Sequence, residues 1–377
     1  MTTPSPRKTS PALIFLILCL VSFAALGLYF FRAARQTGPA NDAEQSETAP
    51  SSGPPAANPS PSPSGSEPAA GAKPPDASIQ PDEPATPAPK RIYFRSTNVE
   101  RGYGQMAYLD LPRLDAPPSL TSLSCEVLDV SISGAGICLV ATRGVLTRYD
   151  AILFNPGGKT RHSIPLGGIP SRTRLNRDGT MAATTVFLTG HGYDSVDFTT
   201  ETLLIDTRTG TPLVNLEEYS VSRGGKRIDA KDVNYWGVTF TPDGKRFYCT
   251  LSTNRQHYLV RADIATRTGE TLRDNVECPS LSPNGKRVVY KKRIPGSRVA
   301  WRLHILDLAA NVETPLPETR SVDDQLEWLD DGHVLYSLPE NASTPSPGTD
   351  VWMIDVDRAT PPTKFLPKAY SPSVVRQ

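Results

Sequence analysis

The chain of 377 residues ends part-way through a repeated β-hairpin unit, and the strand that would complete this unit lies near the start of the folded region. Residues 370–373 (Tyr-Ser-Pro-Ser) resemble the opening of a hairpin, but the chain stops at Gln377 before a second strand can follow. Residues 90–94 have the pattern of residues 286–290, the second strand of a complete unit. A circular array of sheets closed by both ends of the chain explains this split, because closure removes exposed sheet edges.

The complete units are hairpins with an Asp-Gly or Asn-Gly turn. Such a pair between β-rich runs is a strong hairpin signal, because the tight turn needs positive φ. Clear copies occupy residues 240–248, 281–290 and 328–336, and weaker ones start at residues 130, 175 and 370. A third strand follows each hairpin, at residues 107–110, 151–155, 203–206, 260–263, 304–307 and 352–355. The turns are about 41 to 65 residues apart, as in four-stranded blades. The sequence therefore predicts an all-β, six-bladed β-propeller over residues 90–377, closed by its N- and C-terminal strands.

Two of the turns carry a resemblance to a known repeat. Residues 241–245 (Thr-Pro-Asp-Gly-Lys) and 282–286 (Ser-Pro-Asn-Gly-Lys) are similar to the TolB-like propeller repeat, which is also found in propellers of the tricorn and prolyl-oligopeptidase type. The resemblance covers residues 90–377 and implies the propeller fold. It implies little about activity, because propellers host many functions and a fold does not choose among them.

Two segments are predicted ahead of the linker and propeller. Residues 1–11 are expected to be a short cytoplasmic N-terminus. Residues 12–31 form an uncharged apolar stretch, long enough as a helix to cross a hydrocarbon core of about 30 Å. Its length and the basic residues Arg32 and Arg35 favour a transmembrane signal anchor over a cleaved signal peptide. With basic residues also ahead of it, we expect a single-pass protein of the cell membrane with an extracytoplasmic propeller.

Residues 32–89 are rich in Pro, Ala and Ser and almost free of large apolar residues, so they cannot bury a core. We expect a disordered linker that acts as a tether; a proline-rich ligand for other domains has the same composition. The formal net charge of the chain is +1, and both signs are spread along it. This charge pattern argues against a nucleic-acid partner.

Four cysteines lie in the predicted propeller, namely Cys125, Cys138, Cys249 and Cys278. Disulfides are permitted outside the cytoplasm. Four cysteines allow three connectivities, and their spacing favours none of them. The expectation is therefore four free, buried cysteines, with any pairing left open.

The sequence lacks the usual catalytic signatures. It contains no Gly-x-Ser-x-Gly elbow, no His-Glu-x-x-His zinc motif, no Cys-x-x-Cys pair and no Gly-rich phosphate loop. The turn residues Asp178, Asp243, Asn284 and Asp331 are expected to bond to the backbone rather than to a ligand. Accordingly no catalytic residue, metal ligand or cofactor is predicted.

Two insertions interrupt the repeat between Asp178 and Asp243, at residues 189–197 and 218–227. Insertions on a rigid scaffold often carry binding residues. The first offers groups that suit a ligand or cation and the second offers cations to an anionic surface; the alternative is a pair of solvated variable loops. The candidate ligand-binding residues are His191, Tyr193, Asp194, Asp197, Arg223, Lys226 and Arg227.

The leading functional hypothesis is a membrane-tethered, non-catalytic binding or scaffold module for a protein, peptide or envelope polymer. The alternative is a propeller enzyme of the lyase, lactonase or hydrolase type with a metal or ligand site at the central channel. The alternative predicts Asp, Glu or His side chains that face inward at one mouth of the channel.

Overall fold

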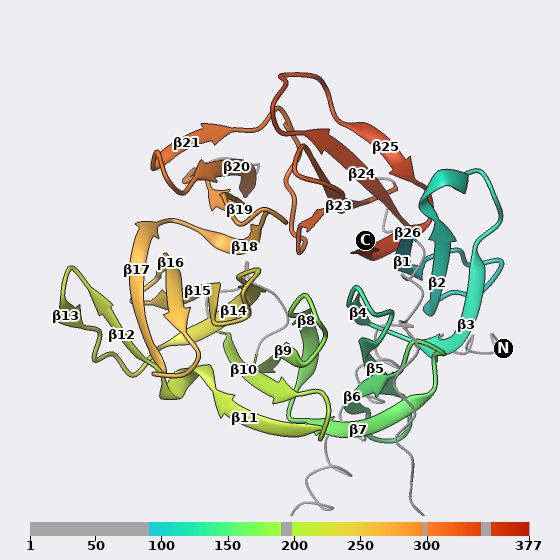
Figure 1. The fold of residues 1–377 in the computed structure, drawn as a ribbon, viewed down its shortest axis with the longest axis horizontal. Helices are drawn as coiled ribbons and strands as arrows, with labels where there is room; N and C mark the ends of the chain where they lie inside the picture. The colour runs from blue at the N-terminus through green and yellow to red at the C-terminus, as the bar shows by residue number, and fades with distance from the viewer. Residues whose placement is uncertain (1–89, 190–197, 297–299, 341–347, 377) are drawn as a thin grey trace, which may run out of the picture. The chain divides into compact units, whose positions relative to one another are not determined.

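The computed structural model describes residues 90–189, 198–296, 300–340 and 348–376, all within one compact unit that spans Gln80–Gln377. Six sheets surround a common axis and form the blades of a propeller (Figure 1). The predicted six-bladed, all-β propeller is confirmed. The predicted segments 1–11, 12–31 and 32–89 lie outside the described residues, and the described part of the chain holds no helix that is long and apolar enough to span a membrane.

The blades are numbered in the chain order of their innermost strands, and the strands of each blade are given from the innermost outward. Blade 1 contains β4 (Val127–Val130), β5 (Gly136–Thr142), β6 (Arg148–Phe154) and β7 (Thr160–Leu166). Blade 2 contains β8 (Ile169–Leu175), β9 (Met181–Thr189), β10 (Thr199–Asp206) and β11 (Thr211–Asn215). Blade 3 contains β14 (Asn234–Phe240), β15 (Arg246–Thr253), β16 (Gln256–Asp263), β17 (Thr268–Asp274), β12 (Ser220–Arg223) and β13 (Lys226–Arg227).

The other three blades have four strands each. Blade 4 contains β18 (Glu277–Leu281), β19 (Arg287–Arg293), β20 (Trp301–Asp307) and β21 (Val312–Pro315). Blade 5 contains β22 (Glu327–Trp328), β23 (His333–Pro339), β24 (Thr349–Asp355) and β25 (Thr363–Leu366). Blade 6 contains β26 (Ala369–Val375), β1 (Arg91–Ser96), β2 (Gln105–Asp110) and β3 (Ser119–Ser124). Two short 3₁₀ helices, η1 (Leu111–Arg113) and η2 (Leu216–Glu218), complete the described elements.

Blade 6 closes the ring with strands from both ends of the chain, β26 on the inside and β1 beside it (Figure 1). The two strands are antiparallel, with Ile92 opposite Val374. Val288 lies opposite Leu281 in the same way in blade 4. The expected split of one blade between the two termini is therefore confirmed.

The register of the C-terminal strand differs from the expectation. Residues 370–373 do not open a turn but lie inside β26, where Ser371 has φ +50°. Cys278 (φ +48°) and Gly237 (φ +65°) take the same backbone conformation in β18 and β14, and in all three inner strands the register shifts at a bulge. Residues 370–373 therefore copy the bulge of an inner strand rather than a turn. The prolines that follow Cys278 and Ser371 are tolerated because an inner strand is a sheet edge.

The hairpin turns are held by their own side chains, as the sequence predicted. Asp243 accepts a hydrogen bond from the Lys245 N–H at 3.1 Å, and Asp178 accepts one from the Thr180 N–H at 3.1 Å. Asn284 accepts one from the Lys286 N–H at 2.9 Å. Asp331 instead accepts a bond from the Asn284 N–H at 3.0 Å and so joins the turns of blades 5 and 4.

The core consists of apolar clusters between adjacent sheets. One cluster packs Leu303 and Ile305 of blade 4 against Trp328 and Tyr336 of blade 5. Such contacts bury the face that a single amphipathic sheet cannot cover alone. Trp236, Trp301 and Trp328 are buried in this core.

The expectation of four free cysteines is wrong for two of them. Cys125 and Cys138 form a disulfide with their Cα atoms 5.3 Å apart. The chain ahead of β4 lies against β5, where the Glu126 N–H bonds to the Leu139 carbonyl at 2.7 Å, and this brings Cys125 beside Cys138. The repeat pattern could not show this pair, because Cys125 lies in the connection between β3 and β4, outside the repeated strands. Cys249 and Cys278 are free and buried, as expected.

The second insertion is an ordered hairpin, β12 and β13, rather than a loop. β12 pairs parallel to β17, the outermost repeat strand of blade 3, with Ser220 opposite Thr268. The insertion therefore extends blade 3 away from the axis (Figure 1).

Candidate functional site

The inner strands place one side chain of each repeat at an equivalent position near the axis. In blades 1 to 5 this position lies five residues before the turn glycine. We call this set the channel ring: Asp129, Arg174, Thr239, Ser280, Glu327 and, in blade 6, Ser373.

Four members of the channel ring accept a hydrogen bond from the backbone of the next blade. The bonds are Leu175 N–H to Asp129 (2.7 Å), Leu281 N–H to Thr239 (3.1 Å), Val374 N–H to Glu327 (3.3 Å) and Val130 N–H to Ser373 (2.9 Å). Inner-strand amides that face the axis have no further strand to pair with, so they need such partners. The repeated bond also fixes Ser373 as the member of the ring from blade 6.

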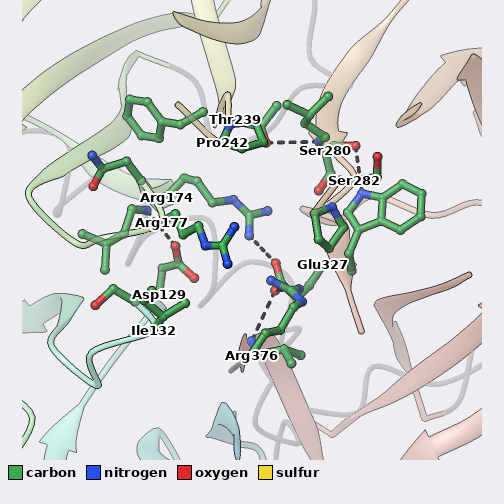
Figure 2. Close-up of a pocket in the computed structure, with 18 of the residues that line it drawn as sticks. Asp129, Ile132, Arg174, Arg177, Thr239, Pro242, Ser280, Ser282, Glu327 and Arg376 are labelled. Atoms are coloured by element: carbon green, nitrogen blue, oxygen red, sulfur yellow. Dashed lines mark hydrogen bonds and ion pairs between the residues drawn. The ribbon is translucent and has the colours of Figure 1, made fainter. Parts of the chain in front are cut away.

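At the centre of the ring, Glu327 of blade 5 binds two arginines. The Arg174 guanidinium of blade 2 pairs with one carboxylate oxygen, and Arg376, just past β26, pairs with the other (Figure 2). Burial alone would lower the pKa of Arg174, but the charges of Glu327 and Asp129 raise it above its usual value. Glu327 is thus an anion held between two cations in the interior.

The channel is crossed below this ion bridge by the chain that leads into β22. Gln325 donates a hydrogen bond to the Thr173 carbonyl of blade 2 at 2.8 Å, and Arg174 donates one to the Leu326 carbonyl at 2.9 Å. Asp323 pairs with Arg172 of blade 2 and with the fully buried Lys291 of blade 4. Blades 2 and 5 are opposite in the ring, so these contacts span the channel and close it.

Asp129 has a structural role in the same layer. Its carboxylate accepts hydrogen bonds from the Leu175 N–H at 2.7 Å and the Ser373 hydroxyl at 2.6 Å, and so joins blades 1, 2 and 6. Burial raises the pKa of Asp129 above its usual value, although the nearby charge of Arg174 offsets part of the effect. Asp129 therefore holds its proton more tightly than a surface carboxylate.

Above the channel ring, on the face of the hairpin turns, the propeller has a hollow of about 220 Å³ to which all six inner strands or their turns contribute. Its rim comes from a second repeat position, two residues before the turn glycine, occupied by Ile132, Arg177, Pro242 and Pro283. Arg376 follows β26 at the corresponding place. We call this feature the axial hollow.

Arg177 is the cation of the axial hollow that is available to a ligand. Its side chain is exposed and reaches toward the centre of the hollow (Figure 2). In the part of the chain that the structure describes, its guanidinium has no hydrogen-bond or ion-pair partner. The buried Nε atoms of Arg174 and Arg376 also lack an acceptor there. Buried donors without a partner are costly and mark a place where an acceptor would be favourable.

The axial hollow is therefore cationic. Three arginines face two carboxylates, which gives a formal charge of +1, or +2 when Asp129 is protonated. The enzyme hypothesis predicts inward-facing Asp, Glu or His side chains at a channel mouth. Asp129 and Glu327 are such side chains, but arginines and backbone amides occupy their carboxylates. Among the described residues no three His, Cys, Asp or Glu side chains come together as a set that could hold a metal ion. The chemistry of the hollow suits an anion.

The candidate residues of the two insertions are not part of this hollow. His191, Tyr193, Asp194 and Asp197 lie outside the described residues. The strand ends that flank them, at Thr189 and Thr199, lie on the face opposite the hairpin turns. These four residues stay a prediction.

The basic residues of the second insertion lie at the outer edge of blade 3. Arg223 pairs with Asp274 at 2.7 Å and stacks over Tyr258, with the guanidinium 4.8 Å from the ring centre. Lys226 and Arg227 are exposed on β13. The structure brings these three residues together on one hairpin, where their proposed contact with an anionic surface stays a prediction.

The residues of the axial hollow were missed because each was considered alone. Arg174 and Glu327 look like ordinary charged residues of a strand, and Arg177 precedes an Asp-Gly turn. An alignment of the repeats on their turn glycines places Arg174 and Glu327 at one position in opposite blades, and such an alignment would have revealed the ion bridge.

Comparisons with known proteins agree with the architecture. No family model and no curated protein matches the chain. Among solved structures, TolB from Acinetobacter baumannii aligns at 16% identity with a TM-score of 0.54, over 76% of this chain and 66% of that one. The TolB-like propeller fold is confirmed. The chain thus spans about two thirds of the length of that TolB. A nidogen/laminin complex aligns at 10% identity with a TM-score of 0.50, over 76% of this chain and 98% of that one. At these identities the likeness concerns the fold alone.

Proposed function

We propose that this TolB-like propeller is a non-catalytic binding module and that the axial hollow binds an anionic group of a protein, peptide or envelope polymer. In this proposal residues 12–31 anchor the chain in the cell membrane and residues 32–89 give the propeller its reach. The observation that carries the proposal is the unpaired Arg177 over a hollow to which all six blades contribute.

The ion bridge below Arg177 supports a binding role. Glu327 is saturated by Arg174, Arg376 and the Val374 N–H, and is therefore poorly placed to act as a general acid or base. A rigid scaffold with closed sheets fixes the backbone that carries Arg177, which limits the backbone entropy lost on binding. The nidogen/laminin structure is a protein complex, in line with a protein partner.

The test uses the full-length protein and two acetylated peptides, Gly-Glu-Gly-Glu-Leu with a free C-terminus and Gly-Gln-Gly-Gln-Leu with a C-terminal amide. Binding is followed by calorimetry and by the fluorescence of Trp328, which lines the hollow. We expect the charged peptide to bind more tightly than the neutral one. Because a hydrogen bond to a charged group contributes about 1.5–3 kcal/mol, Arg177→Gln should weaken binding of the charged peptide by about tenfold or more.

The matched control is Arg161→Gln, which removes an exposed arginine from β7 on the outside of blade 1. This variant should bind the charged peptide as the wild type does. Equal affinity for the two peptides, or a loss that is the same in the Arg177 and Arg161 variants, would refute the axial hollow as the anion site.

A further inference from the structure

The axial hollow has a cationic centre and an apolar rim. Ile132, Pro242 and Pro283 contribute the apolar part, and Ile132 is 39% exposed. Arg177 and Arg376 occupy the same rim position in blades 2 and 6. A ligand that satisfies both parts must carry an anionic group beside an apolar one.

The hollow is also blind. The ion bridge of Glu327 with Arg174 and Arg376 forms its floor, and the chain around Gln325 crosses the channel beneath. A peptide that bound by an internal residue would have to enter and leave through the same mouth. At about 220 Å³ the hollow is smaller than the sites of about 300–1,000 Å³ that hold drug-sized ligands. It has room for one end of a chain but not for a loop.

The hydrogen-bond donors of the hollow that have no partner match the acceptors of a carboxylate. A carboxylate has two oxygens that accept several hydrogen bonds, often from both nitrogens of one guanidinium. Arg177 offers a guanidinium without a partner, and the Nε atom of Arg376 is a second free donor. Glu327 disfavours a doubly charged group such as a phosphate, because the carboxylate lies on the floor of the hollow.

We propose that the axial hollow captures the C-terminal residue of a peptide or protein, with the α-carboxylate on Arg177 and Arg376 and an apolar last side chain against Ile132, Pro242 and Pro283. Capture of a chain end at a terminal carboxylate is an established mode of peptide recognition. This inference rests on the proposed function, since it names the source of the anion that the hollow binds.

The test separates the α-carboxylate from side-chain carboxylates. Full-length protein is titrated with two further acetylated peptides, Gly-Gln-Gly-Gln-Leu with a free C-terminus and Gly-Glu-Gly-Glu-Leu with a C-terminal amide. The first has only the α-carboxylate and the second has only side-chain carboxylates. We expect the first to bind at least about tenfold more tightly than the second.

Two variants examine the two parts of the hollow. Arg177→Gln should abolish the preference for the free C-terminus, while Arg161→Gln keeps it. Ile132→Ser, at an exposed rim position, should remove the preference for a last Leu over a last Ser and leave the preference for the free C-terminus intact. If the amidated Glu peptide binds as tightly as the Gln peptide with a free end, the capture of a chain end is refuted while the proposed anion site stands. If neither peptide binds better than the neutral one, both are refuted.

Discussion

Glu327→Gln removes the charge at the centre of the ion bridge and keeps the shape of the side chain. The Glu327 side chain is 6% exposed and that of Arg174 is 12% exposed, so water screens this pair little. Removal of one partner from a buried pair costs about 3–5 kcal/mol, because the remaining charge stays buried without compensation. Here Arg174 and Arg376 would face each other without an anion between them. The amide oxygen can still accept the Val374 N–H, so we expect the lower end, a loss of about 3 kcal/mol in the free energy of unfolding.

The loss is measured by urea denaturation followed by tryptophan fluorescence and circular dichroism. The control is Glu218→Gln, which breaks the exposed ion pair with Arg267, whose side chains are 57% and 52% exposed. Surface pairs contribute about 0–1 kcal/mol, so this variant should unfold almost as the wild type does. The double variant Arg174→Gln with Glu327→Gln should recover part of the stability, because it leaves fewer uncompensated charges. A Glu327→Gln protein as stable as the Glu218→Gln protein would refute the ion bridge as a structural link across the channel.

Three further predictions concern the disulfide, the closure of the ring and the pH dependence of stability. The denatured, unreduced protein should show three reactive thiols from its five cysteines, and five thiols before reduction would exclude the bond. The double variant Cys125→Ser with Cys138→Ser should lower the free energy of unfolding by about 3 kcal/mol, as expected for a closed loop of about 15 residues. Ser373→Ala leaves the Val130 N–H and one Asp129 oxygen without a partner and should cost about 1–3 kcal/mol in thermal or urea unfolding, whereas Ser163→Ala on β7 should not. The pKa of Asp129 in the folded protein lies above its value of 3.8 in the unfolded chain, so the folded protein binds this proton more tightly than the unfolded chain does. The wild type therefore loses stability as the pH rises through the pKa of the folded state. Asp129→Asn should lack this loss, and a constant stability difference between the two proteins from pH 4 to pH 8 would contradict it.

The fold was predictable because the blades repeat a strong local signal. Residues 243–244 and 284–285 form turns whose side chains bond to their own backbone, and this chemistry is contained in a few neighbouring residues. Closure by β26 and β1 followed from the count of strands. The register of residues 370–373 was misjudged, because a residue followed by proline occurs both in the turn, as Ser282-Pro283, and in the bulge before Ser280, as Cys278-Pro279. Only the pairing of Val374 with Ile92 distinguishes the two.

The site was less predictable because it depends on contacts between distant parts of the chain. Arg174 and Glu327 are far apart in the sequence. They come into contact because both lie on innermost strands of opposite blades and face each other across the axis. The Cys125–Cys138 bond depends on how the chain enters β4, which no repeat pattern describes. Insertions are a common place for binding residues, whereas the hollow is built from regular repeat positions that differ from blade to blade.

One of the two repeat positions joins adjacent blades, and the other is the position that we propose for recognition. The channel ring must supply hydrogen-bond acceptors for the next blade, and Asp129, Thr239, Glu327 and Ser373 do so. The rim residues Ile132 and Arg177 do not have this structural role. The residue that follows the rim position stabilises the turn instead, as Asp178 does in blade 2. A substitution of Ile132 or Arg177 should therefore change what the hollow binds in the proposed function at little cost to the fold, while a substitution in the ring disturbs the junction between two blades. This division predicts that variants of Ile132 and Arg177 alter ligand preference without loss of stability, and it explains how a closed ring of similar blades acquires one asymmetric, cationic hollow.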